Sequence, residues 1–241
     1  MAYEFKAIKR AVTLSQEVQD QIEQAILEKK FQPGEKLPTE FELAEMFGVS
    51  RTAIREALQM LRAKGLISVK KRDGIYIENY SPKNVIKPMR FFFELNFNED
   101  LIKHLVEIRK IIEPEICRLA ARNRSEDDLK DLEKSLNEFS RVDGNDAELE
   151  GKLDRDFHRI IARATHNSVI PIMMDPIYQI LPKIKTLILA KISTAKDSAQ
   201  RYHQLIFERI RDQDEEGAYL VMKKHMDIAE SHSRELISKI K

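Results

Sequence analysis

Apolar residues recur every three or four positions along most of this chain, which is the spacing of amphipathic helices. Two short segments of this kind meet between residues 38 and 63. Thr39 followed three residues later by Glu42 is a capping box that begins the first helix, while Gly48 can end it and Ser50 can cap the second. The apolar residues of the second helix share one face: Ile54, Ala57, Leu58 and Leu61. The pattern predicts two helices joined by a tight turn.

The spacing changes from helical to alternating directly after this helix pair. Ile67 and Val69 alternate with polar residues, and Ile75–Ile77 alternates again. The segment between them, Lys71–Gly74, has the composition of a turn. The sequence therefore predicts a β-hairpin beside the second helix, and these elements together make a winged helix-turn-helix.

Beyond residue 80 the alternation ends and helical spacing continues. Pro114 interrupts the first long helical segment, where we expect a kink, and Val142–Asp146 has the pattern of a turn around Gly144. A short apolar stretch covers Met89–Leu95, and longer helical segments fall at about 101–122, 125–140, 147–165, 168–192, 196–212 and 215–239. We expect a mainly α protein whose C-terminal part is an all-α bundle of six or seven helices.

The two parts are separated by a break in the pattern, and the composition suits a two-domain protein. We predict a winged helix-turn-helix domain over residues 1–79, a linker over 80–88 that ends at Pro88, and an all-helical domain over 89–241. With 241 residues, of which 42% are hydrophobic, the chain can bury two cores. No apolar run has the length of a membrane span, and the single cysteine, Cys117, forms no disulfide framework and suits the core. We therefore expect a cytoplasmic protein that does not bind membranes.

Basic side chains gather on the second helix and the hairpin, although the whole chain has a net charge of only +1. Between Arg51 and Arg72 seven residues are basic, and Glu56 is the only acidic one. Arginines at the start of a recognition helix can enter the major groove, and a basic hairpin tip can contact phosphates. We predict DNA binding, against the alternative of an ordinary helical hairpin with solvated arginines. The candidate DNA-binding residues are Ser50, Arg51, Thr52, Arg55, Lys71 and Arg72.

This part of the chain resembles the GntR family of bacterial transcription regulators. The resemblance begins at Leu14, runs through the hairpin, and rests on the segments PGEKLPTE, GVSRTAIREAL and KGLI. It implies a winged-helix domain in which Arg51 and Arg55 read guanine edges. It also implies that Ser50 and Thr52 hold phosphates of the DNA backbone.

Two positions depart from the family pattern. Phe41 stands where many relatives have an arginine that contacts DNA, so the resemblance does not extend that base or phosphate contact to this chain. Arg72 stands where the wing often carries a glycine. The general mode of DNA binding that the resemblance implies survives both changes.

Within the helical part, a carboxylate and three imidazoles form a candidate metal-binding set. Asp154 and His158 lie four residues apart on one predicted helix, and His203 and His225 lie on the last two. One carboxylate and three imidazoles suit a divalent transition metal, with zinc first and nickel, manganese or iron as alternatives. Spacing alone leaves the plainer interpretation open, because a histidine on a long helix is more often a solvated or satisfied core residue.

A second resemblance favours the metal interpretation. The segments EIRKIIEPEICRLAA and DRDFHRIIARATHN, with the last two helices, resemble the FCD domain of the FadR-like GntR subgroup over nearly all of residues 88–240. Metal-binding members of that domain use an aspartate, a histidine four residues later and two further histidines. The resemblance implies that Asp154, His158, His203 and His225 are the ligands.

Arg109 is the candidate effector-binding residue. It follows an apolar stripe, and a buried arginine needs an anionic partner. The resemblance implies that it faces the cavity and binds the carboxylate of a small organic acid, such as a sugar acid, a hydroxy acid or a dicarboxylate. The alternative is a salt bridge to Glu113 on the same helix. His232 can line the same cavity or be solvated.

Together these features predict a transcription regulator rather than an enzyme. We expect a repressor that binds a two-fold-symmetric DNA operator as a homodimer, and whose operator affinity is controlled by a small organic acid at the metal site. Two alternatives remain: a metalloenzyme fused to a DNA-binding domain, and a regulator whose metal is purely structural.

Overall fold

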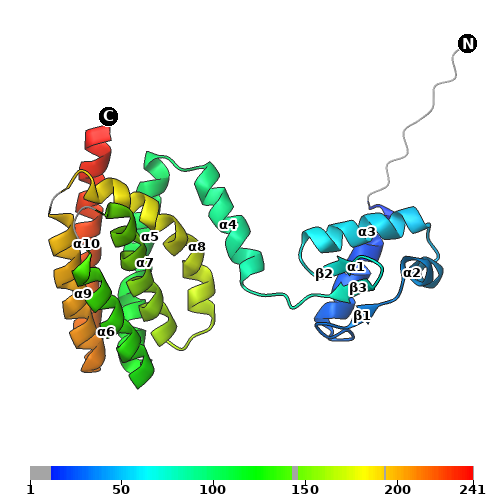
Figure 1. Cartoon of the computed structure of the whole chain (residues 1–241), viewed down its shortest axis with the longest axis horizontal. Coiled ribbons are helices and arrows are strands. Elements are labelled where there is room, and N and C mark those ends of the chain that lie inside the picture. Colours follow the sequence, from blue (N-terminus) through cyan, green and yellow to red (C-terminus); the bar gives the residue numbers. More distant parts are fainter. Residues whose placement is uncertain (1–11, 143–145, 193, 241) are drawn as a thin grey trace, which may run out of the picture. The chain divides into compact units, whose positions relative to one another are not determined.

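The computed structural model of the chain describes residues 12–142, 146–192 and 194–240. The chain divides into two compact units, Met1–Asn84 and Val85–Lys241 (Figure 1). This division falls inside the segment that the sequence marks as a linker. Helix α4 (Lys83–Leu95) already begins there, so Pro88 lies inside a helix rather than before one. Asn84 accepts a hydrogen bond from the backbone of Ser81, which helps this helix to begin early.

The N-terminal unit is a winged helix-turn-helix, as predicted. Its three strands form an antiparallel sheet in the order β1-β3-β2, in which Val69 pairs with Ile75. The two-residue strand β1 has no signal in the sequence pattern, because it is defined only by its pairing with β3. The elements are α1 (Leu14–Leu27), β1 (Lys36–Leu37), α2 (Glu40–Phe47), α3 (Arg51–Ala63), β2 (Ile67–Lys70) and β3 (Gly74–Ile77).

The ends of helices α2 and α3 have the capping interactions that the sequence predicts. A capping box begins α2: the Thr39 side chain accepts a hydrogen bond from the amide of Glu42, and the Glu42 carboxylate accepts one from the amide of Thr39. Gly48 ends α2 with a φ of 65°, a left-handed conformation that glycine adopts without steric cost. Ser50 then caps α3 by accepting a hydrogen bond from the amide of Ala53. These caps hold the start of α3 in place, which is the end that carries the candidate DNA-binding side chains.

The C-terminal unit consists of seven helices among the residues that the structure describes, and no strand follows β3 there. This confirms the predicted all-α bundle. Pro114 lies inside α5, and of the predicted turn at Val142–Asp146, residues 143–145 lie outside the described part of the chain. Besides α4, the helices are α5 (Glu99–Asn123), α6 (Glu126–Arg141), α7 (Ala147–Ala164), α8 (Val169–Leu189), α9 (Ala195–Arg211) and α10 (Glu215–Ile240).

The core of this unit lies between the long helices α5, α7, α8, α9 and α10, which pack against one another (Figure 1). Cys117 is fully buried in this core, and burial raises the pKa of its thiol, so it is a small core residue as the sequence indicates. Each of these five helices contributes apolar side chains to the cluster, which also includes Leu132 of α6; among the others are Ile116, Phe157, Ile180, Ile206 and Met226. Within the described residues, no helix is both long and apolar enough to cross a membrane.

Candidate nucleic-acid interface and candidate metal centre

Helix α3 separates its apolar and polar faces sharply. Ile54 and Leu61 are completely buried against the rest of the N-terminal unit. Arg51, Thr52 and Arg55 are exposed at the beginning of the helix. The helix therefore presents two guanidinium groups and a hydroxyl to solvent at the end that a recognition helix places in the major groove.

Glu40, at the start of α2, lies beside the two arginines, and the sequence analysis did not single it out. Its Oε2 accepts a hydrogen bond of 2.7 Å from Nε of Arg55 and lies 4.0 Å from Nη2 of Arg51. Both pairs are solvent-exposed, so their contribution to folding stability is small. Their effect is on orientation, because Glu40 holds the Arg55 guanidinium in one direction before any partner binds.

The wing is a basic hairpin whose tip departs from ideal backbone geometry. Lys71 and Arg72 are exposed in the turn between β2 and β3. Arg72 has a φ of 65°, the left-handed conformation that glycine adopts freely and other residues adopt at a cost. A glycine at the position of Arg72 would adopt this conformation without that cost.

Three histidines from three helices meet in the core of the C-terminal unit. His158 on α7, His203 on α9 and His225 on α10 are all buried, and a ring nitrogen from each lies within 4.8 Å of the others. Asp154, one turn before His158, is also buried, and its Oδ1 lies 3.6 Å from Nε2 of His203. The structure thus brings the three histidines of the predicted metal-binding set together and places Asp154 beside one of them, His203.

The ring nitrogens of this cluster are unusual for a protein core. Within the described residues, neither nitrogen of His203 has a hydrogen-bond partner, although the ring is completely buried and stacks on Phe157 with 4.1 Å between centroids. Nδ1 of His225 also has no such partner there. Burial lowers the pKa of His203 to about 3 and lowers that of His225, so both rings are neutral at pH 7. Neutral imidazoles without partners are the form of histidine that binds metal ions.

Glu113 on α5 supports the cluster from outside. Its Oε2 lies 2.7 Å from Nδ1 of His158, and its Oε1 accepts a hydrogen bond of 2.5 Å from Nε of Arg109. Burial alone would raise the pKa of Glu113, but the charges of Arg109 and His158 outweigh it and lower the pKa. A carboxylate beside Nδ1 favours the proton on that nitrogen and leaves Nε2 of His158 free to coordinate.

Two of the distances within this group are close to those between ligands of a single metal ion. Two ligand atoms that both lie about 2.1 Å from one ion are separated by about 3.0–3.4 Å at octahedral or tetrahedral angles. The Nε2 atoms of His158 and His225 lie 3.4 Å apart, close to the 3.6 Å between Asp154 and His203. Three buried imidazoles with a carboxylate beside one of them are donors that suit a divalent transition metal.

Arg109 forms the ion pair that the sequence offers as the alternative to effector binding, and it also lies beside the histidine cluster. It is only 6% exposed, it forms the predicted alternative salt bridge to Glu113, and its Nη2 lies 3.4 Å from Nε2 of His158. It also lines a cavity of about 30 Å³, together with Asp154, Lys185, His225 and His232. A cavity of this size holds about one water molecule or ion, and an organic acid would require it to widen.

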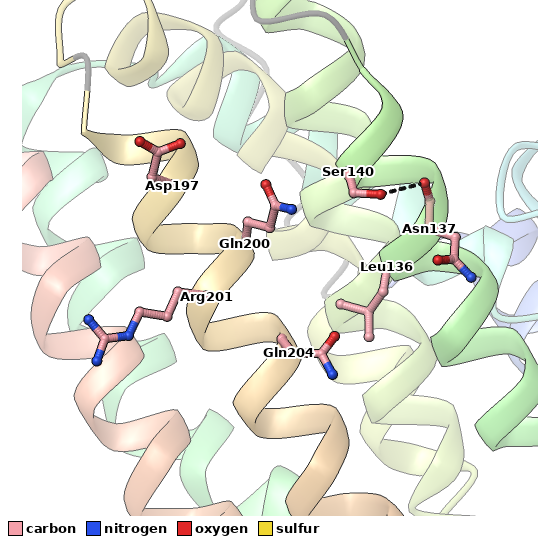
Figure 2. Close-up of a pocket in the computed structure, with 7 residues that line it drawn as sticks. All are labelled: Leu136, Asn137, Ser140, Asp197, Gln200, Arg201 and Gln204. Atoms are coloured by element: carbon pink, nitrogen blue, oxygen red, sulfur yellow. Dashed lines mark hydrogen bonds between the residues drawn. The ribbon is translucent and has the colours of Figure 1, made fainter.

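A larger hollow of about 420 Å³ lies between α6 and α9 and has a different character. Figure 2 shows that Asn137 and Ser140 approach it from α6, opposite Gln200 and Gln204 on α9. These four side chains are exposed, and the seven lining residues include no histidine or cysteine. This open polar surface therefore offers hydrogen bonds but no buried charge, unlike the histidine cluster.

Known proteins of one kind resemble this chain. LutR of Bacillus subtilis (strain 168), an HTH-type transcriptional regulator, is 34% identical over 152 residues, which cover 63% of this chain and 68% of LutR. The galactonate operon transcriptional repressor of Escherichia coli (strain K12) is 29% identical over 80% of this chain and 85% of its own length. Among solved structures, a GntR protein of Streptococcus agalactiae has a TM-score of 0.63 at 26% identity, covering 90% of this chain and 99% of that one.

Family profiles match both units. Residues 14–77 match the bacterial regulatory proteins of the gntR family, and residues 104–228 match the FCD domain. The names of the family and of these relatives describe transcriptional regulators and not enzymes. The chain therefore belongs to the GntR family of bacterial transcriptional regulators and combines a GntR helix-turn-helix domain with a C-terminal FCD domain.

Proposed function

We propose that this regulator is a homodimeric repressor whose operator affinity is controlled by a small organic acid bound at a metal site in the FCD domain. The observation that supports this most is the buried cluster of His158, His203 and His225, in which ring nitrogens lack partners among the described residues. Buried polar groups without partners are costly in a stable core, so their presence favours a functional role.

In the DNA-binding half, the proposal uses the exposed side chains of α3 and the wing. Arg51 and Arg55 would bind guanine edges in the major groove, and Ser50 and Thr52 would hold the adjacent phosphates. Lys71 and Arg72 would contact the backbone beside the recognition helix. The relatives that are named repressors support the direction of control, since the galactonate operon protein carries that word in its name.

In the FCD half, Asp154, His158, His203 and His225 would hold a divalent transition metal, with zinc first and nickel, manganese or iron as alternatives. Such an ion supplies positive charge to which a carboxylate can bind. Glu113, with Oε2 2.7 Å from Nδ1 of His158, would orient this ring so that Nε2 is the coordinating nitrogen. The protein's contribution is therefore a set of buried nitrogen donors held by three helices.

Arg109 would bind the carboxylate of the acid. Its guanidinium lies 3.4 Å from Nε2 of His158, so an anion bound beside the histidines would lie within reach of it. Charge-assisted hydrogen bonds from arginine to carboxylate are among the stronger polar contacts in proteins. The class of acid is supported by names among the relatives, which include a galactonate operon repressor and a putative L-lactate dehydrogenase operon regulatory protein.

A homodimer would carry two recognition helices to the two halves of a symmetric operator. Helix α4 supports the proposal of an association surface, because Phe91, Phe92 and Leu95 are all more than half exposed. A cluster of exposed apolar side chains on one helix is typical of an interface. Acid binding would change the equilibrium between arrangements of the two DNA-binding domains through the segment around residues 79–88.

Calorimetric titration of organic acids tests the metal-anchored effector. We expect at least one of L-lactate, D-galactonate and succinate to bind the metal-loaded protein and to bind the metal-stripped protein at least about tenfold more weakly, on the scale of one lost charge-assisted contact. Arg109→Lys should still bind the metal but should bind the acid more weakly, since lysine cannot reproduce the planar guanidinium. Equal acid affinity in all three forms would leave the metal with a structural role only.

A further inference from the structure

Helix α8 contributes one cation to the histidine cluster, Lys185, which the metal-binding set does not use. Its Nζ lies 2.8 Å from Oδ1 of Asp154, and the two side chains are 15% and 2% exposed. The same oxygen of Asp154 lies 3.6 Å from Nε2 of His203. An ammonium group and a metal ion held by this set would therefore meet at one carboxylate oxygen.

The buried charges nearest the cluster are neutralised in pairs. Arg109 pairs with Glu113, and Lys185 pairs with Asp154, so these two buried pairs sum to zero charge. A divalent cation adds two positive charges at the carboxylate that Lys185 already neutralises. Like charges repel more strongly in a buried site than in water, so Lys185 cannot remain at Asp154 without cost when a cation binds there.

Of the two buried cations, Lys185 and Arg109, Lys185 is the one whose side chain can move. Its side chain reaches solvent in part and ends in a flexible four-carbon stem, whereas the planar guanidinium of Arg109 is held by Glu113. Both side chains line the same cavity of about 30 Å³. Movement of Lys185 away from Asp154 would widen this cavity and leave an ammonium group free beside it.

We propose that Lys185 competes with the metal ion for Asp154, and that metal binding releases its ammonium group to bind the carboxylate of the organic acid. This inference rests on the proposed function and adds to it the order of events. The acid gains a second cationic partner only after the metal has displaced Lys185. Metal binding and acid binding are therefore coupled through one side chain rather than through the ion alone.

Titration of the metal alone tests the first half of the proposal. Calorimetry with zinc or nickel on the full chain should show that Lys185→Met binds the metal about tenfold more tightly than the wild type, because the competing contact is gone. Lys185→Arg keeps the charge and should keep affinity near the wild-type value. Lys183→Met, on the same helix but at an exposed position, is the matched control and should not change it.

Acid titration into the metal-loaded variants tests the second half. Lys185→Met should bind the tightest acid of the L-lactate, D-galactonate and succinate panel about tenfold more weakly, while Lys183→Met binds it as the wild type does. A rise in metal affinity with a fall in acid affinity is a pattern that simple damage to the fold cannot produce. Lys185→Gln replaces Lys185→Met if thermal unfolding shows that the methionine variant is not folded.

The two proposals fail in different ways. A wild-type chain that binds neither zinc nor nickel would overturn the proposed metal site itself. If the wild type, Lys185→Met and Lys185→Gln all bind the metal with the same affinity, the proposed competition is overturned and the metal site remains. Unchanged acid affinity in variants that bind metal more tightly would overturn the transfer of Lys185 to the acid.

Discussion

Replacing His203 by alanine is expected to remove metal binding from the FCD domain. In the proposed site His203 is one of four ligands, and its ring nitrogens have no hydrogen-bond partner among the described residues. Loss of a residue that only hydrogen-bonds a ligand typically lowers metal affinity about 10–100-fold, so loss of a ligand itself should lower the affinity by more than about 100-fold. Elemental analysis after purification, followed by calorimetric titration with zinc, nickel and manganese, measures the effect.

A second histidine provides the matched control for this prediction. His104 lies exposed on α5 and outside the cluster, so His104→Ala should bind metal as the wild type does. Metal should also raise the unfolding temperature of the wild type and of His104→Ala, but not that of His203→Ala, because only bound metal stabilises the folded state. Equal metal content in His203→Ala and the wild type would show that the four-residue set is wrong.

Loss of either arginine at the start of α3 is expected to weaken operator binding strongly. Arg51→Ala and Arg55→Ala should each cost about 1–3 kcal/mol if each side chain makes a bidentate contact with guanine. The operator can be obtained by selecting bound duplexes from a random pool, and affinities can then be measured by fluorescence anisotropy. Specificity should relax at the base that each arginine contacts.

The wing provides the contrast for this measurement. Lys71→Ala removes a charge that would contact phosphate. It should therefore lower the affinity for all DNA sequences alike and reduce the salt dependence of binding. The arginine variants should instead discriminate less between the selected operator and a duplex with the contacted guanine replaced. Operator affinity that is unchanged in both arginine variants would remove the assignment of α3 as the recognition helix.

The parts of the fold that local chemistry determines could be predicted from the sequence. The capping box of Thr39 and Glu42, the left-handed Gly48 and the cap at Ser50 each depend on residues within three positions of one another, and all are present in the structure. Strand β1 could not be predicted, because Lys36–Leu37 is a strand only through its pairing with β3, nearly forty residues later. The early start of α4 differs from the prediction, because Pro88 indicates a boundary whereas the helix begins five residues before it.

The candidate site shows the same division between local and distant contacts. Asp154 and His158 lie four residues apart on one helix, so their proximity follows from helical geometry alone. The pairing of Lys185 with Asp154 could not be predicted, since it depends on how α8 packs against α7. The sequence indicates Glu113 only as a partner of Arg109, four residues earlier on the same helix. Its contact with His158 depends on the packing of α5 against α7.

Operator binding in the presence of the acid tests the central proposal most directly. The affinity of the full chain for its selected operator is measured with and without the tightest-binding acid, in metal-loaded and in metal-stripped protein. The account predicts that the acid weakens operator binding of the metal-loaded protein by about 5–150-fold, the usual range of allosteric coupling, and leaves that of the metal-stripped protein unchanged. An acid that binds the metal-loaded protein without changing its operator affinity, or that changes it equally in both forms, would contradict the account.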